Sequence, residues 1–72
     1  MDFWRDLIKT RNGKFVLIDT RWTIDAGWET MVFSANKNGE VTNGLDFDCV
    51  QYGSKEEAAV GHTEIINKWM KS

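Results

Sequence analysis

The chain has 72 residues, with nine Lys and Arg, eleven Asp and Glu, one His, one Cys and no Pro, so its formal charge is −2. This length fits one domain over residues 1–72 and excludes a large enzyme with a separate substrate domain, while the charge excludes a strongly basic nucleic-acid binder. No apolar run approaches the roughly 20 residues that cross a bilayer, and a single Cys cannot form an internal disulfide. We therefore expect a cytoplasmic protein in a reducing compartment, with no contact to a membrane.

The start of the chain is predicted to form a short helix. Asp2 is a suitable N-cap, and Asn12-Gly13 would end the helix, because Gly accepts the left-handed conformation that follows a helix C-terminus. The apolar residues between these points recur at helical spacing and would form one stripe, made of Phe3, Trp4, Leu7 and Ile8.

Three strands in an antiparallel meander are predicted next, over Lys14 to Ile24, Trp28 to Ala35 and Leu45 to Tyr52. The loop Asp25-Ala26-Gly27 suits a hairpin, and Asn36 to Glu40 is a clear turn, with Asn43-Gly44 as a second one. In the third strand apolar residues alternate with carboxylates, which indicates that one face of the sheet meets water.

A long C-terminal helix is predicted from the capping box Ser54-Lys55-Glu56-Glu57 to about Lys71. Its apolar arc contains Ala58, His62, Ile65, Ile66 and Trp69. Gly61 costs about 1 kcal/mol in mid-helix relative to Ala, and its place at the border of this arc suggests close approach to the sheet. The predicted fold class is α+β: a short N-terminal helix, a three-stranded antiparallel meander and a long C-terminal helix packed on the sheet.

The residues from about Thr20 to Trp69 resemble a family of small phage and prophage proteins of Gram-positive bacteria. The resemblance rests on the strand Glu29-Thr30-Met31-Val32-Phe33 and on the helix pattern Y-x-S-x-E-E-A-x-x-G-H, which runs from Tyr52 to His62. It implies the setting of a phage accessory gene and action in the host cytoplasm. It implies no activity and no catalytic residue.

His62 and Cys49 are the residues that suggest chemistry, because a Cys/His pair can generate a thiolate nucleophile. The alternative is a core histidine that bonds a backbone carbonyl or Tyr52, with Cys49 acting as a small apolar residue. No second His, oxyanion turn or metal-ligand spacing accompanies the pair. We therefore favour the core interpretation and predict a protein that is not an enzyme and has no cofactor and no metal.

Acidic and aromatic residues are the candidates for binding. The carboxylates Asp46, Asp48 and Glu29, with Asp19 and Asp25, could form an acidic face that meets a basic partner, although an ordinary solvated sheet surface is the simpler explanation. The aromatic surface offered by Trp4, Trp22 and Trp28 is larger than a thin core needs. Either core and edge packing or a binding patch explains these residues. Trp28 is the favoured exposed anchor.

These features predict a non-enzymatic phage accessory protein that binds, and inhibits or modulates, a host protein, with a homodimer as a further option. The alternative is a small nucleic-acid-binding regulator. It would use the basic residues of the predicted N-terminal helix beside Trp4, namely Arg5, Lys9, Arg11 and Lys14. Asp2 and Asp6 dilute this basic cluster, so nucleic acid is the less favoured partner.

Overall fold

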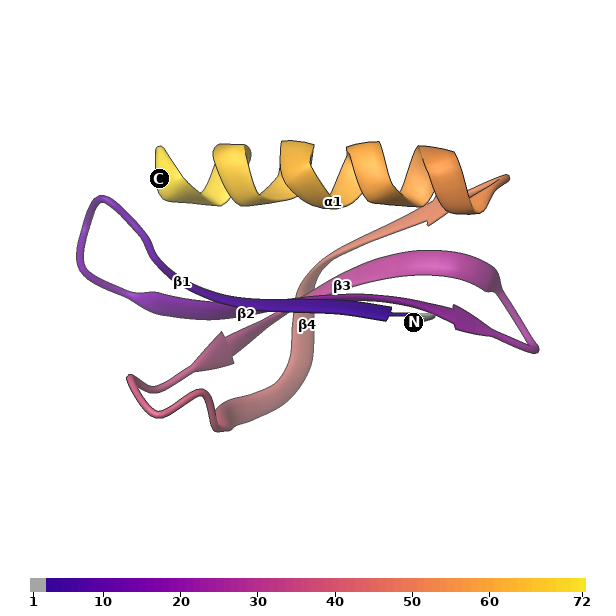
Figure 1. The fold of residues 1–72 in the computed structure, drawn as a ribbon. Coiled ribbons are helices and arrows are strands. Elements are labelled where there is room, and N and C mark those ends of the chain that lie inside the picture. Colours follow the sequence, from indigo (N-terminus) through magenta and orange to yellow (C-terminus); the bar gives the residue numbers. More distant parts are fainter. Residues whose placement is uncertain (1–2) are drawn as a thin grey trace.

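The computed structural model describes residues 3–72, and within this range it describes every side chain except those of residues 43–47. The described residues form four strands and then one helix: β1 (Phe3–Lys9), β2 (Phe15–Thr23), β3 (Gly27–Ala35), β4 (Val41–Tyr52) and α1 (Lys55–Met70). Neighbouring strands pair antiparallel in the order β1-β2-β3-β4. The helix lies along one face of this sheet (Figure 1), which we call the helix face, and the opposite face is called the open face.

The predicted N-terminal helix is wrong, because residues Phe3–Lys9 form the edge strand β1. Two adjacent apolar pairs, at positions 3–4 and 7–8, fit a helical stripe but equally fit a strand with an apolar residue on each face. The Asn12-Gly13 pair belongs to the β1–β2 hairpin turn, where Gly13 has a positive φ of 89°. Thr10 closes this turn, because its N–H donates to the carbonyl of Lys14 at 2.7 Å.

The predicted three-stranded meander is also wrong, because the sheet has four strands within residues 3–72 and β4 begins before the predicted Asn43-Gly44 turn. The β3–β4 turn is formed at Asn36, whose side-chain oxygen accepts the N–H groups of Asn38 and Glu40. The pairing of β3 with β4 contains register shifts beside Phe33, and such irregularities bend a strand.

The sheet curls over its open face like half of a barrel. A Cβ atom on Gly39, in the β3–β4 turn, would lie 3.8 Å from Cδ2 of Leu7 on β1. The two outer strands therefore approach each other across the open face, and Leu17 of β2 is buried there without a helix above it.

The helix and the main core agree with the sequence-based prediction for this segment. Ser54 caps α1, since its hydroxyl accepts the N–H of Glu57 at 3.1 Å. The core lies between α1 and the helix face, and it contains Val16, Ile18, Val32 and Ile65. Ile18 and Val32 are paired across β2 and β3 and are fully buried. In the described residues, no helix is long and apolar enough to cross a membrane.

Gly61 of α1 lies against the aromatic ring of Tyr52, the last residue of β4. A Cβ atom built at Gly61 would overlap the ring atoms Cε1 and Cζ and the hydroxyl oxygen of Tyr52. This contact confirms the close approach that was predicted for Gly61, and it fixes the distance between α1 and the adjoining strand.

Candidate functional site

A chain of hydrogen bonds runs through the centre of the molecule and includes a side chain from every element. His62 of α1 bonds Asp6 of β1 through Nε2, at 2.7 Å, and Thr20 of β2 through Nδ1, at 2.6 Å. Thr20 bonds Thr30 of β3, and the hydroxyl of Tyr52 on β4 donates to Thr30 at 3.0 Å. We call these five residues the polar chain.

The direction of each bond in the polar chain follows from donor and acceptor chemistry. A carboxylate only accepts, so Nε2 of His62 carries the hydrogen that is donated to Asp6. When Nε2 alone carries the ring hydrogen, Nδ1 accepts from Thr20 and Thr20 accepts from Thr30, while Thr30 accepts from Tyr52. Each hydroxyl therefore donates once, and the three buried residues His62, Thr20 and Thr30 are satisfied without water.

The order Asp6, His62, Thr20 has the connectivity of a carboxylate–imidazole–hydroxyl triad. A nucleophile must reach a substrate, however, and Thr20 is fully buried while His62 is only 5% exposed. The Thr20 oxygen also contacts Thr30 on its other side. In this arrangement the polar chain connects the strands and the helix, and the hydroxyl groups of Thr20 and Thr30 are closed to external molecules.

The structure confirms His62 as a core histidine but gives it different partners from those predicted. Its partners are Thr20 and Asp6, and Tyr52 is linked to it only through the two threonines. Asp6 and both threonines were not among the predicted site residues. The available indication was that Thr20 and Thr30 interrupt otherwise apolar alternation on adjacent strands, and two such hydroxyls can bond each other.

Cys49 is separated from His62 by the thickness of the sheet. Its partner in the register is Met31, whereas the adjacent pair Val32 and Asp48 lies on the helix face. Cys49 is exposed, so its expected place as a small core residue is wrong. The structure therefore does not form a Cys/His pair. Within the described residues, no group of three His, Cys, Asp or Glu side chains could hold a metal ion.

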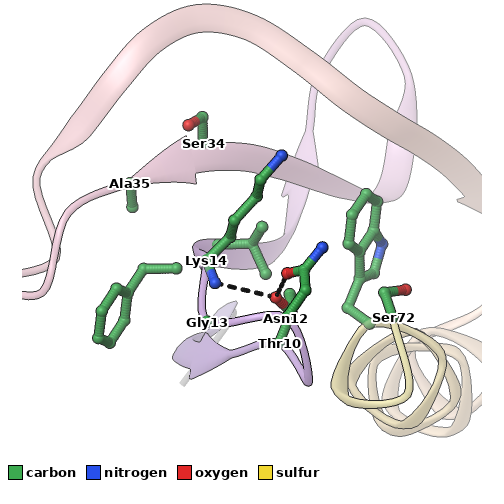
Figure 2. A pocket seen from close by; sticks show the side chains of 10 residues that line it. Thr10, Asn12, Gly13, Lys14, Ser34, Ala35 and Ser72 are labelled. Carbon is green, nitrogen blue, oxygen red and sulfur yellow. Dashed lines mark hydrogen bonds between the residues drawn. The ribbon is translucent and has the colours of Figure 1, made fainter.

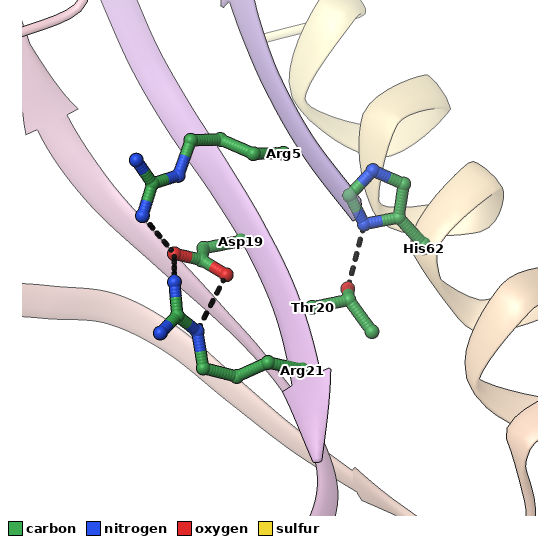
Figure 3. Close-up of polar contacts among 5 residues, drawn as sticks. All are labelled: Arg5, Asp19, Thr20, Arg21 and His62. Atoms are coloured by element: carbon green, nitrogen blue, oxygen red, sulfur yellow. Dashed lines mark hydrogen bonds and ion pairs between the residues drawn. The ribbon is translucent and has the colours of Figure 1, made fainter. Parts of the chain in front are cut away.

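A second polar cluster lies on the open face, on the other side of β2 from Thr20 (Figure 3). Asp19 accepts one hydrogen bond from Arg5 at 3.0 Å and two from Arg21, at 3.0 and 2.8 Å. The hydrogen bonding of Arg21 to Asp19 and the negative charge of Asp19 raise the pKa of Arg21, while desolvation opposes the rise. Asp19 is thus a buried carboxylate whose charge is compensated by two partly exposed guanidinium groups.

Replacing Asp19 with alanine is expected to lower the free energy of unfolding by about 1–2 kcal/mol, because it leaves two guanidinium groups side by side without their shared acceptor. Arg5→Ala should cost less, within about 0.5 kcal/mol, since Arg5 is half exposed and Asp19 keeps Arg21. Urea denaturation of both variants measures the difference. Equal costs for the two variants would contradict the role assigned to Asp19.

Three tryptophans gather at the end of the sheet that contains the β2–β3 turn, all on the helix face. Trp22 pairs with Trp28 in the register, and Trp28 pairs with Tyr52. The rings of Trp4 and Trp28 are 5.7 Å apart, and the Trp4 ring is 6.3 Å from that of His62. Trp22 is 54% exposed, and Ile24 in the adjoining turn is 86% exposed. We call Trp4, Trp22, Trp28 and Ile24 the tryptophan patch.

The most exposed tryptophan of this patch is Trp22 and not Trp28, which was the favoured anchor. Trp28 and Trp4 are half-buried beneath their neighbours, so the outermost ring is that of Trp22. Trp22 was predicted to be surplus aromatic surface but was not predicted to be the exposed residue. Its position beside a short hairpin turn, where a ring can be covered from one side only, was the available indication.

The acidic residues do not form one face. Asp48 lies on the helix face and pairs with Lys68 of α1 at 2.8 Å, whereas Glu29 lies on the open face. Asp19 is buried between its two arginines, and Asp25 is in the β2–β3 turn. The side chain of Asp46 lies outside the described residues. The predicted common acidic surface therefore does not hold for the four carboxylates that can be placed.

The basic residues of the predicted N-terminal helix are also divided. Arg5 is bound to Asp19 on the open face, while Trp4 packs on the helix face against Trp28. Lys9, Arg11 and Lys14 are at the opposite end of β1, at and beside the β1–β2 turn. Trp4 thus cannot act beside these three basic residues. Comparison of the chain with protein-family models, with curated proteins and with solved structures gives no match.

Proposed function

We propose that this chain is a non-enzymatic phage accessory protein that binds a host protein and modulates its activity. The phage setting rests on the resemblance of residues 20–69 described above. The mode of action rests on the tryptophan patch, which is the single observation that carries the proposal. Tryptophan is over-represented among the residues that dominate binding energies at protein interfaces.

The support from the tryptophan patch is geometric. The Trp28 ring contacts that of Trp4, and strand pairing places Trp28 between Trp22 and Tyr52. The base of the patch is therefore fixed before any partner binds. A preorganised surface loses little conformational entropy on binding. The exposed parts of the patch, Trp22 and Ile24, are large apolar groups that water solvates poorly. Such groups serve as anchors that insert into a partner.

The surroundings of the patch indicate the chemistry of the partner. Asp25 adjoins Ile24, and the first turn of α1 carries Glu56 and Glu57 next to Lys55 at the same end of the molecule (Figure 1). An apolar centre with an acidic rim suits a partner surface that is apolar in the middle and basic around it. Host proteins that bind nucleic acid present surfaces of this charge.

The test is affinity capture from host lysate with the wild-type chain and with Trp22→Ala. Loss of a central tryptophan at an interface costs about 2 kcal/mol or more, so capture of the partner should weaken roughly 30-fold. The matched control is Val60→Ala, which removes an equally exposed apolar group from the outer side of α1. Circular dichroism should show that both variants remain folded.

The proposal also requires an effect on the captured protein. The purified partner should lose or change its own activity when the wild-type chain is added, and it should not respond to Trp22→Ala. Equal capture by the wild-type chain and by Trp22→Ala would remove the tryptophan patch from the interface. A captured partner whose activity is unchanged would contradict the modulating role.

A further inference from the structure

The fold separates charge between the two ends of the molecule, although the net charge is only −2. The end that contains the β1–β2 turn, the β3–β4 turn and the last turn of α1 (Figure 1) is rich in basic residues: Lys9, Arg11, Lys14, Lys37 and Lys71. We call it the basic end. Lys68 is also there, but Asp48 neutralises it. Glu40 in the β3–β4 turn is a carboxylate at the basic end, and the other end carries Asp25, Glu56 and Glu57 together with Lys55.

A pocket of about 700 Å³ opens at the basic end, between the β1–β2 turn, the end of β3 and the end of α1 (Figure 2). This volume is within the range of about 300–1,000 Å³ that is usual for sites that take small molecules and cofactors. Its aromatic wall is the ring of Trp69, and its polar side chains are those of Asn12, Lys14 and Ser34. Phe15 also borders the pocket, but its ring belongs to the open face, where Lys9 lies over it.

The polar side of the pocket is held in place by its own hydrogen bonds. The Thr10 hydroxyl accepts the N–H of Lys14 at 3.1 Å and donates to Oδ1 of Asn12, and the N–H of Asn12 donates to the carbonyl of Ser72 at 3.1 Å. The Asn12 Nδ2 group bonds nothing else in the part of the chain that is described, and neither Lys14 nor Arg11 forms an ion pair there. Donors and positive charge thus remain for a ligand.

We propose that this pocket binds a nucleotide unit, with its base against the ring of Trp69 and its phosphate at Lys14. Aromatic side chains next to a positively charged groove are the combination that binds single nucleotides of a nucleic-acid strand, because every base has a face that stacks. The amide of Asn12 and the hydroxyl of Ser34 can hydrogen-bond the edge of a base. An acidic polypeptide would use the lysines but would leave the aromatic wall and the amide without a role.

This inference goes beyond the proposed function and depends on a different part of the molecule. The tryptophan patch belongs to the end with the β2–β3 turn, and the pocket belongs to the end with the β1–β2 turn (Figure 1). Trp22→Ala should therefore bind nucleotides as the wild-type chain does. Failure of one proposal leaves the other unaffected.

The experiment uses fluorescence anisotropy with a labelled oligothymidylate of about 10 nucleotides, a length within the usual site sizes of single-strand binders. Calorimetric titration with uridine and adenosine monophosphates runs in parallel. Lys14→Glu should weaken binding of the oligonucleotide about tenfold or more, and Asn12→Ala should weaken it less. The matched control is Lys55→Glu, which makes the same charge change at the opposite end of α1. With about three phosphate contacts, affinity should fall roughly 20-fold between about 50 and 200 mM salt.

The outcomes separate the sources of the nucleotide. Binding of monophosphates and of the oligonucleotide supports a pocket for free nucleotides, and binding of the oligonucleotide alone supports a pocket for one unit of a strand. The proposal is overturned if neither binds at low salt, or if Lys55→Glu weakens binding as much as Lys14→Glu does. Competition by polyglutamate as strong as that by unlabelled oligonucleotide would also overturn it, because the pocket would then bind anions without regard to the base.

Discussion

Gly61→Ala is expected to destabilise the protein by about 2 kcal/mol, although alanine is the better helix former by about 1 kcal/mol. The added methyl group would overlap the ring and hydroxyl oxygen of Tyr52. Either the ring or α1 must then move, and a moved ring loses its hydrogen bond to Thr30. The free energy of unfolding in urea measures the loss.

Two further variants isolate the cause. In a Tyr52→Ala background the overlap is absent, so Gly61→Ala should become stabilising by up to about 1 kcal/mol. Gly53→Ala is the matched control, because a Cβ atom there would meet only Glu57 Oε1, at 3.5 Å. A loss at Gly61 that persists in the Tyr52→Ala background would place its cause elsewhere.

The second large effect is expected for His62→Leu, which introduces an apolar side chain of similar size and removes the centre of the polar chain. Thr20 loses its acceptor inside the core, and an unsatisfied buried hydroxyl costs about 1–3 kcal/mol. Asp6 loses a donor as well, but it is half exposed, so water replaces that bond. The expected decrease in the free energy of unfolding is about 2–3 kcal/mol.

A double-mutant cycle with Thr20→Val tests whether the polar chain acts as a unit. If His62 and Thr20 are coupled, the double variant should lose less than the sum of the two single losses, by about 1 kcal/mol. Asp6→Asn is a mild comparison, since its side-chain oxygen still accepts from Nε2. Additive losses for His62→Leu and Thr20→Val would show that the two residues contribute independently.

The sequence predicted the parts of the fold that are set by local chemistry. The Ser54 cap, the extent of α1 and the close approach of Gly61 follow from neighbouring residues, and the structure confirms them. The β2–β3 hairpin at Gly27 is confirmed for the same reason, because a positive φ there needs glycine.

The errors concern segments whose state is decided by distant residues. The residues of β1 fit a helix or a strand equally well, and pairing with β2 decides between them. The site was predicted in part: the tryptophans were named, but their common location requires the register of three strands. The predicted acidic face failed because the register of β3 with β4 places Asp48 opposite Val32 on the helix face and Glu29 opposite Gln51 on the open face.

The edge strand β1 also determines how two copies of the chain can meet. A symmetric antiparallel pairing of two β1 strands must be centred on a residue, because opposite residues share a face. A centre at Arg5 or at Asp6 places that residue against its own copy, and a centre at Leu7 places Arg5 against Lys9. Like charges directly opposite each other destabilise a ladder, so each of these registers is disfavoured. The charges of β1 therefore disfavour self-association of this edge in the registers centred on the middle of the strand.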